Sequence, residues 1–325
     1  MPPIPPSGRP RVIVYYQTHH SPSNGAPISV LPLVTQPNID LTHLILAAIH
    51  INEDPHKLTL NDHAPSHPRF QTLWAEMRVL QASGVKVMGM LGGAAKGSFT
   101  RLDGSQDQFE RYYAPLHALI KERHLDGMDL DVEEEMSLNG IIRLIDRLRA
   151  DFGSSFIITL APVATALVDF TKNISGFNYE ELEVMRGKDI AWYNTQWYCG
   201  WGDFSNPILF EWMVFKGWPV DKLVIGLVTS PANGSGFISM DLVGQSLTLL
   251  TARYGGFGGV MGWEYFNSLP GGEGRPWEWA QAMTQLTRKH FTGTAKKEVV
   301  EIDGSWHAHV PTDFEYYSDD SDADS

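Results

Sequence analysis

Cysteine is almost absent from this sequence of 325 residues. Cys199 is the only one, so no disulfide can form within the chain, and the cysteine content does not call for an oxidising compartment. Long apolar runs are also missing, because no stretch reaches the roughly 20 residues that a membrane-spanning helix needs. We therefore expect a protein that has no membrane partner.

Signals for secretion are missing from the first residues as well. Residues 1–9 form a proline-rich extension, and the N-terminal run MPPIPPSGRP lacks both the basic segment and the apolar stretch of a signal peptide. We expect a cytoplasmic protein on this ground. The alternative is a secreted protein whose signal has been removed.

Positive charge is scarce. The 25 Lys and Arg residues face 38 Asp and Glu residues, which gives a formal net charge of −13 at pH 7 and argues against a nucleic-acid partner. Six of these acids lie in residues 312–325, which hold no Lys or Arg. The composition of residues 292–325 predicts a low-complexity acidic tail that is mostly disordered.

Apolar and aromatic residues are plentiful. They make up 43% of the chain and include ten Trp, eleven Tyr and fifteen Phe, which is enough to form a substantial core and suits a sugar-binding cleft. Runs rich in Val, Ile and Leu recur at the spacing of βαβ units and begin near Val12, His43, Val85, Leu125, Phe156, Ile190, Leu223 and Gly259.

Segments with helical periodicity separate these runs: residues 70–82, 108–122, 138–152, 179–185, 208–215, 240–254 and 277–290. Eight apolar strands that alternate with helices predict an α/β fold, a (β/α)8 TIM barrel over residues 10–291 that would hold the active site. The alternative is a doubly wound open sheet.

The run that begins at Leu125 carries an unusual density of acids, reading DGMDLDVE with two further glutamates behind it. Because side chains alternate along a strand, Asp129, Asp131 and Glu133 should share the inner face, while the apolar residues between them face the helices. Carboxylates this close cannot all ionise cheaply, so at least one pKa must rise and Glu133 becomes a candidate general acid. The alternative is a solvated acidic loop or a cation site.

This string resembles the D-G-x-D-x-D-x-E signature of glycoside hydrolase family 18, which includes chitinases and endo-β-N-acetylglucosaminidases. The runs VKVMGMLGGAAKGSF, WYNTQWY and GGVMGWEYFNSLPGG resemble the small fungal endo-β-N-acetylglucosaminidases of the family, of the Endo T type. The resemblance covers residues 10–291. It implies hydrolysis between the two core N-acetylglucosamines of N-linked, high-mannose glycans, with glycans or glycoproteins as the partners.

The resemblance also implies roles for single residues. Glu133 matches the general acid/base, Asp131 the acid that holds the substrate's N-acetyl group, and Asp129 the acid that shares a proton with Asp131. The acetamido oxygen of the substrate then attacks the anomeric carbon, so the enzyme supplies no nucleophile and needs no cofactor. Tyr198 matches the tyrosine that steadies the oxazolinium intermediate.

Four further residues are expected to bind the substrate. Trp263 matches the tryptophan that forms the floor beneath the reacting sugar. Asn194 and Gln196 share a strand face with Tyr198 and are expected to bond the N-acetyl group or the sugar hydroxyls. Tyr16 is expected to line the same pocket.

Two departures from the chitinase pattern stand out. Many chitinases have an aromatic residue where this chain has Val132, and a serine where it has Met90. A chitinase acting on β-1,4-N-acetylglucosamine polymers remains an alternative, as does an inactive chitinase-like lectin. The twelve histidines show no spacing typical of a metal site, so we expect no metal, and we expect the chain to act as a monomer.

Overall fold

The fold described here is that of a computed structural model, and the description covers residues 8–288. The strands are β1 (Arg11–Tyr16), β2 (His43–His50), β3 (Thr59–Leu60), β4 (Lys86–Gly92), β5 (Gly127–Asp131), β6 (Ile157–Leu160), β7 (Trp192–Gln196), β8 (Leu223–Val228) and β9 (Gly259–Trp263). The α-helices are α1 (Pro32–Thr35), α2 (Gln71–Ala82), α3 (Ser98–Leu102), α4 (Gln106–Arg123), α5 (Leu138–Phe152), α6 (Tyr179–Arg186), α7 (Ile208–Phe215), α8 (Met240–Tyr254) and α9 (Glu278–Arg288).

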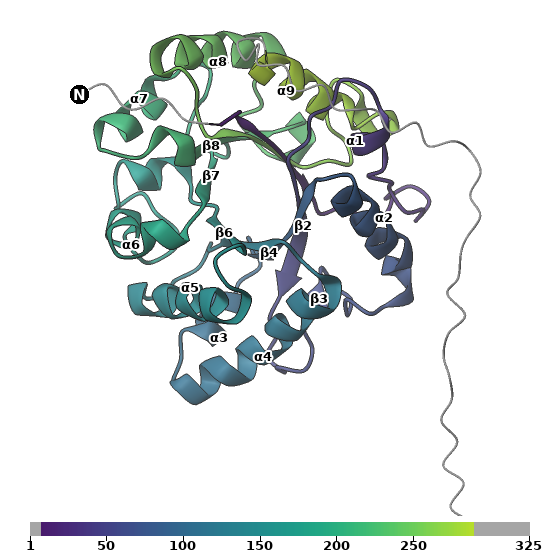
Figure 1. Cartoon of the computed structure of the whole chain (residues 1–325), viewed down its shortest axis with the longest axis vertical. Coiled ribbons are helices and arrows are strands. Elements are labelled where there is room, and N and C mark those ends of the chain that lie inside the picture. The colour runs from purple at the N-terminus through teal and green to yellow at the C-terminus, as the bar shows by residue number, and fades with distance from the viewer. Residues whose placement is uncertain (1–7, 289–325) are drawn as a thin grey trace, which may run out of the picture. The chain divides into compact units, whose positions relative to one another are not determined.

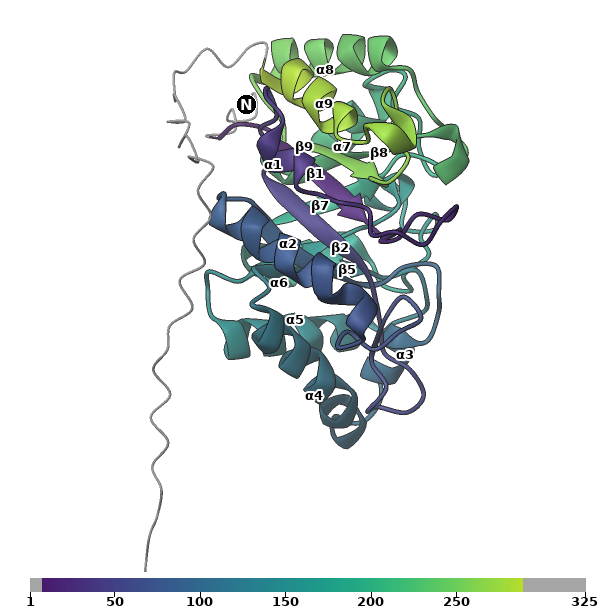
Figure 2. The same ribbon diagram turned by 90° about the vertical axis from the view of Figure 1, so that its right-hand side faces the viewer.

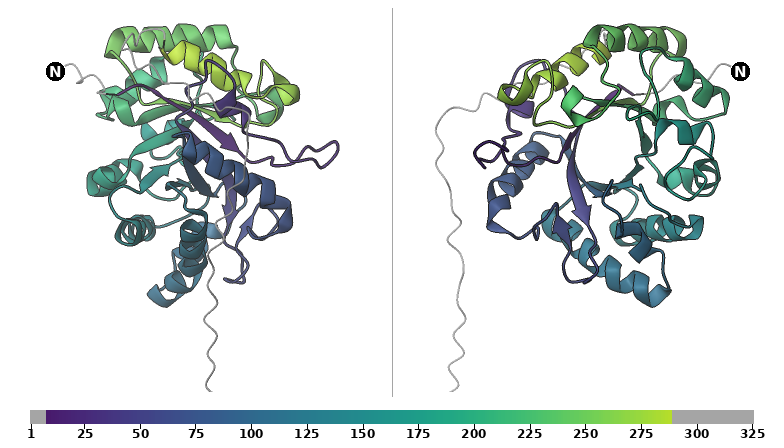
Figure 3. Two further views of the ribbon diagram at one scale, coloured as in Figure 1. Left: turned by 45° about the vertical axis from the view of Figure 1, so that its right-hand side comes forward. Right: turned by 180° about the vertical axis from the view of Figure 1, so that it is seen from behind.

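Eight parallel strands close into a barrel. Their order is β1-β9-β8-β7-β6-β5-β4-β2, and the pairing of β1 with β2 completes the ring, which Figure 1 shows along its axis and Figure 3 shows again from behind. The predicted (β/α)8 barrel is confirmed. The alternative of an open sheet is wrong, because β1 is hydrogen-bonded on both of its edges.

Two apolar layers result from the alternation of side chains along the strands. The larger one lies between the strands and the surrounding helices, and it includes Met128, Leu130 and Val132 of the acidic run. The smaller one fills the barrel interior and includes Tyr15, Met90 and Trp192. Each strand is therefore buried on both faces, which explains its continuous apolar character.

The helices form the outer layer. Helix α2, for example, packs on the outside of the barrel beside β2 and β4 (Figure 2). Helices α5, α7 and α8 begin and end at the predicted residues. Three elements were missed, β3, α1 and α3, because two to five residues are too few to show a period.

The termini of the chain lie mostly outside the described residues, so the predicted tail at 292–325 and most of the extension at 1–9 stay predictions. Within residues 8–288, no helix is long and apolar enough to cross a membrane.

Candidate active site

The acidic run forms strand β5 and its exit, between β4 and β6. Asp129 and Asp131 point into the barrel and are 0% and 6% exposed, and Glu133 follows at the carboxyl end of the strand. The carboxyl ends of the strands form the face on which barrel enzymes carry their chemistry. The alternative of a solvated acidic loop is wrong, because these carboxylates lie on an inner strand face.

Asp129 lies deepest and receives three hydrogen bonds. Tyr15 donates to its Oδ2 at 2.6 Å, and Thr159 and Asn194 donate to its Oδ1 at 2.6 Å and 3.0 Å. Burial nevertheless keeps the pKa of Asp129 above its ordinary value, although each of these bonds lowers it. The three donors favour the ionised form of Asp129, so a proton shared among these acids is more stable on one of the other carboxylates.

Asp131 and Glu133 are joined by a single amide group. Gln196 Nε2 lies 3.1 Å from Asp131 Oδ1, 3.2 Å from Glu133 Oε1 and 3.0 Å from the carbonyl oxygen of Ala161. This nitrogen carries two hydrogens, so it cannot serve all three acceptors fully at once.

Protons are held tightly by this pair of acids. Burial, together with the charges of Glu133 and Asp129, raises the pKa of Asp131 well above its ordinary value. Burial also raises the pKa of Glu133. The proton that Asp129 does not hold therefore resides on Asp131 or Glu133, which keeps an acid available at the strand end.

A cavity of about 450 Å³ opens over these two carboxylates. The predicted residues that line it are Asp131, Glu133, Gln196, Tyr198 and Trp263. Tyr198 is buried, and burial next to the two carboxylates raises the pKa of its hydroxyl well above the ordinary value, so the hydroxyl stays protonated and can donate a hydrogen bond. The structure thus brings together acids, an amide, a hydroxyl and an indole at one opening.

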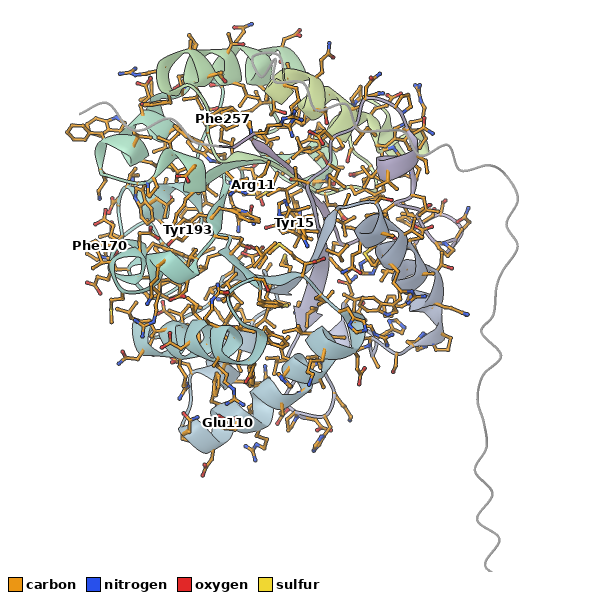
Figure 4. All side chains as sticks on the ribbon, viewed as in Figure 1. Arg11, Tyr15, Glu110, Phe170, Tyr193 and Phe257 are labelled. Carbon is orange, nitrogen blue, oxygen red and sulfur yellow. The ribbon has the colours of Figure 1, made fainter. Side chains whose placement is uncertain are left out.

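Tyr16 does not belong to this cavity, so that prediction is wrong. Its side chain lies in the outer apolar layer, where its hydroxyl donates to the carbonyl oxygen of Ile28 at 2.6 Å. Its neighbour Tyr15 faces the interior instead (Figure 4). The Tyr15 ring meets the Trp263 ring edge-on, with 5.6 Å between the ring centroids. The inward-facing residues of β1 are therefore displaced by one position from the predicted alternation.

Asn194 also differs from its predicted role. It is 0% exposed and does not border the cavity, since its Oδ1 accepts from Trp192 Nε1 at 2.9 Å and its Nδ2 donates to Asp129. It lies one layer below the substrate-accessible groups. It can orient Asp129, but it cannot reach a sugar in the cavity.

Sequence reasoning missed Tyr15 and Thr159, although signals for both exist. Gln17 lies just past β1 and lines the cavity, so its polar side chain marks the inward parity that Tyr15 shares. Thr159 is the polar residue in the apolar strand β6, where a hydroxyl requires a buried partner.

Two further acids of the run, Asp126 and Glu134, are structural. Asp126 accepts from Gln81, from Lys86 and from the backbone of Val87. Glu134 accepts from the backbone of Gly97 and Phe99 around the first turn of α3. Within residues 8–288, no group of three or more His, Cys, Asp or Glu side chains is arranged to hold a metal ion.

Known proteins are similar to this chain in sequence, in fold or in both. The chain is 51% identical to a fungal endo-β-N-acetylglucosaminidase of known structure (TM-score 0.83) and 54% identical to the chitinase ChiC of Aspergillus fumigatus (TM-score 0.78); each match covers 85% of this chain and 98% of the other. Chitinase 2 of Rhizopus oligosporus is 27% identical over 204 residues, which are 58% of this chain and 36% of that protein. The chain thus spans about a third of the length of this longer relative.

The profile of one protein family matches a continuous part of the chain. The family is described as glycosyl hydrolases family 18, and the match covers residues 11–195, from the start of β1 into β7. The match includes the acidic strand with Asp129, Asp131 and Glu133. The chain belongs to glycoside hydrolase family 18.

Proposed function

We propose that the chain is an endo-β-N-acetylglucosaminidase that hydrolyses the β-1,4 bond of the N,N'-diacetylchitobiose core of N-linked, high-mannose glycans. One observation carries the chemistry. Among the described residues that line the cavity, Asp131 and Glu133 are the only carboxylates, and they leave the same strand two residues apart. A double-displacement glycosidase needs a second carboxylate on the opposite side of the scissile bond, so here the substrate itself supplies the nucleophile.

The steps follow from the positions of these groups. Glu133 gives its proton to the glycosidic oxygen, and the raised pKa keeps that proton in place until the bond breaks. Asp131 holds the acetamido N–H, and the acetamido oxygen attacks the anomeric carbon to form an oxazolinium ion as the leaving sugar departs. Glu133, now ionised, takes a proton from water, and the water opens the ring with net retention.

The neighbouring groups position the reaction. The Tyr198 hydroxyl donates to the acetamido oxygen and orients it for attack, and the Trp263 indole supports the apolar face of the reacting sugar. Gln196 holds Asp131 and Glu133 in register. Asn194, with Tyr15 and Thr159, keeps Asp129 ionised beneath Asp131.

The second candidate is a chitinase with the same chemistry, favoured by the 54% identity to ChiC. Two features favour the endoglycosidase. Met90, which replaces the serine of many chitinases, places an apolar side chain in the cavity wall. Val132, which replaces their aromatic residue before the acid, packs in the outer layer.

The test is a mass spectrum of a high-mannose glycoprotein after incubation with the protein, beside the Glu133→Gln variant and a parallel digest of chitin oligosaccharides. A single N-acetylglucosamine left on the glycoprotein, absent with the variant, supports the proposal. Shortening of the chitin oligomers alone would make the protein a chitinase, and no change in either substrate would favour a lectin.

A further inference from the structure

A second pocket adjoins the catalytic cavity. Its volume is about 370 Å³, and it lies beside the carboxyl ends of β1 and β2. Its lining is polar and rich in histidine: Gln17, Thr18, His19, His20, His50, Asn61, Asp62, His63, Arg69 and Phe70. Gln17 and His50 line the catalytic cavity as well, so the two hollows share a wall.

Part of this lining holds the pocket in shape. Asn61 accepts from the backbone of Ala48 and donates to the carbonyl oxygen of Gln17, which ties the loop after β3 to β1 and β2. Arg69 Nη1 lies 3.2 Å from both ring nitrogens of His63, and His20 Nε2 lies 3.1 Å from the carbonyl oxygen of Arg69. The walls are therefore formed before any ligand arrives.

Other polar groups of the pocket make no side-chain hydrogen bond, and Asp62 among them is exposed to solvent. Within residues 8–288, the Asp62 carboxylate, the Gln17 amide and the His50 ring accept and donate no side-chain hydrogen bond. The charge of Asp62 acts on His50, so these two groups lie near each other. A pocket that leaves a carboxylate, an amide and an imidazole free is equipped to bind hydroxyl groups, since a hydroxyl both donates and accepts.

The charges of the pocket argue for a neutral ligand. Burial lowers the pKa of His19 to about 4 and lowers the pKa of His20 and His50 below the ordinary histidine value, so these rings are uncharged near neutral pH. Asp62 and Arg69 are charged side chains of the lining, and Arg69 faces the His63 ring. An anion would meet the Asp62 carboxylate, whereas a neutral vicinal diol can donate two hydrogen bonds to it.

We propose that this second pocket binds a mannose residue of the glycan while the chitobiose core occupies the catalytic cavity, with Asp62 as the principal acceptor for the mannose hydroxyls. The inference rests on the proposed function, because it names the part of the N-glycan that would occupy the second pocket, next to Gln17 and His50. It makes the second pocket a determinant of glycan selectivity.

Kinetics on two substrates test it. Asp62→Ala is compared with the wild type on an oligomannose glycopeptide and on the same glycopeptide stripped of mannose, and His56→Ala, an exposed histidine outside both hollows, is the matched control. We expect the KM for the oligomannose glycopeptide to rise about ten-fold or more at little changed kcat, while the stripped glycopeptide and the control stay within about two-fold of the wild type. An equal loss on both substrates, or no change in KM, would overturn the proposal.

A binding measurement separates this proposal from the proposed function. Saturation-transfer NMR with mannopentaose, which has no chitobiose bond, should show contact with the wild type and a marked loss with Asp62→Ala. Binding that depends on Asp62, in a protein that does not cleave glycoproteins, would support the pocket and refute the endoglycosidase. Cleavage without such binding, or binding of chitopentaose alone, would keep the glycosidase and refute the mannose site.

Discussion

Replacing Tyr15 with phenylalanine should remove a buried hydrogen bond to a carboxylate and leave the rest of the barrel interior in place. The hydroxyl lies 2.6 Å from Asp129 Oδ2, and Tyr15 and Asp129 are 2% and 0% exposed, so water cannot replace the lost donor. A hydrogen bond to a charged group contributes about 1.5–3 kcal/mol. Expressed as linkage, that loss raises the pKa of folded Asp129 further above its ordinary value.

The sign of the pH dependence follows from the raised pKa. Asp129 already has a folded pKa above the ordinary 3.8, so the folded state binds more protons than the unfolded state above that pH, and its stability falls as the pH rises. The Tyr15→Phe variant widens this gap. Its deficit in unfolding free energy should therefore be small at a pH below 3.8 and should grow towards neutral pH.

The assay is urea and thermal unfolding of wild type and variant across that pH range, with Tyr265→Phe as the matched control. Tyr265 is as buried as Tyr15, but its hydroxyl donates to the neutral carbonyl oxygen of Ser29 at 3.1 Å. Its loss should cost about 0.5–1.5 kcal/mol with little pH dependence. At neutral pH the Tyr15→Phe variant should melt about 2–5 °C lower than the wild type. Equal, pH-independent losses for the two variants would refute the reasoning.

Three further variants test the catalytic groups. Glu133→Gln should lower kcat by several orders of magnitude with an unchanged unfolding curve, and near wild-type turnover would refute its role as the acid. Asp131→Asn should impair hydrolysis of the glycoprotein but still transfer sugar from an oxazoline donor, and normal hydrolysis would exclude its role in holding the acetamido group. Gln196→Leu removes a hydrogen-bond donor that lowers the pKa of Glu133, so the basic limb of the pH–rate profile should move to higher pH. A basic limb that moves to lower pH or stays in place would contradict the hydrogen bond between Gln196 and Glu133.

The strand pattern made the barrel predictable, and it located the acids of β5. Continuous apolar runs at a regular spacing require a sheet covered on both faces, and the period of two then decides which acids point inward. The same rule is harder to apply to β1. Tyr15 and Tyr16 are identical side chains, so the two residues by themselves do not show which of them faces inward. The signal that separates them is Gln17, which lines the cavity and shares its inward parity with Tyr15.

The second pocket lay beyond sequence reasoning for a different reason. The spacing of its histidines predicts no metal site and gives no other sign of a shared pocket. The loop after β3 brings Asp62 and His63 beside the exit of β1 through the side chain of Asn61, a contact between segments 44 residues apart. No periodicity carries that information, because β3 is only two residues long.

The cost of burying the β5 acids explains why the site depends on the closed barrel. A buried carboxylate is tolerable only with hydrogen-bond donors, and the donors to Asp129 come from β1, β6 and β7, at sequence separations of 114, 30 and 65 residues. Opening the ring at β1 would leave the deepest acid short of its Tyr15 donor. The closure of the barrel and the protonation of the β5 acids are thus linked equilibria, and a change that weakens the barrel should alter the pH dependence of its stability.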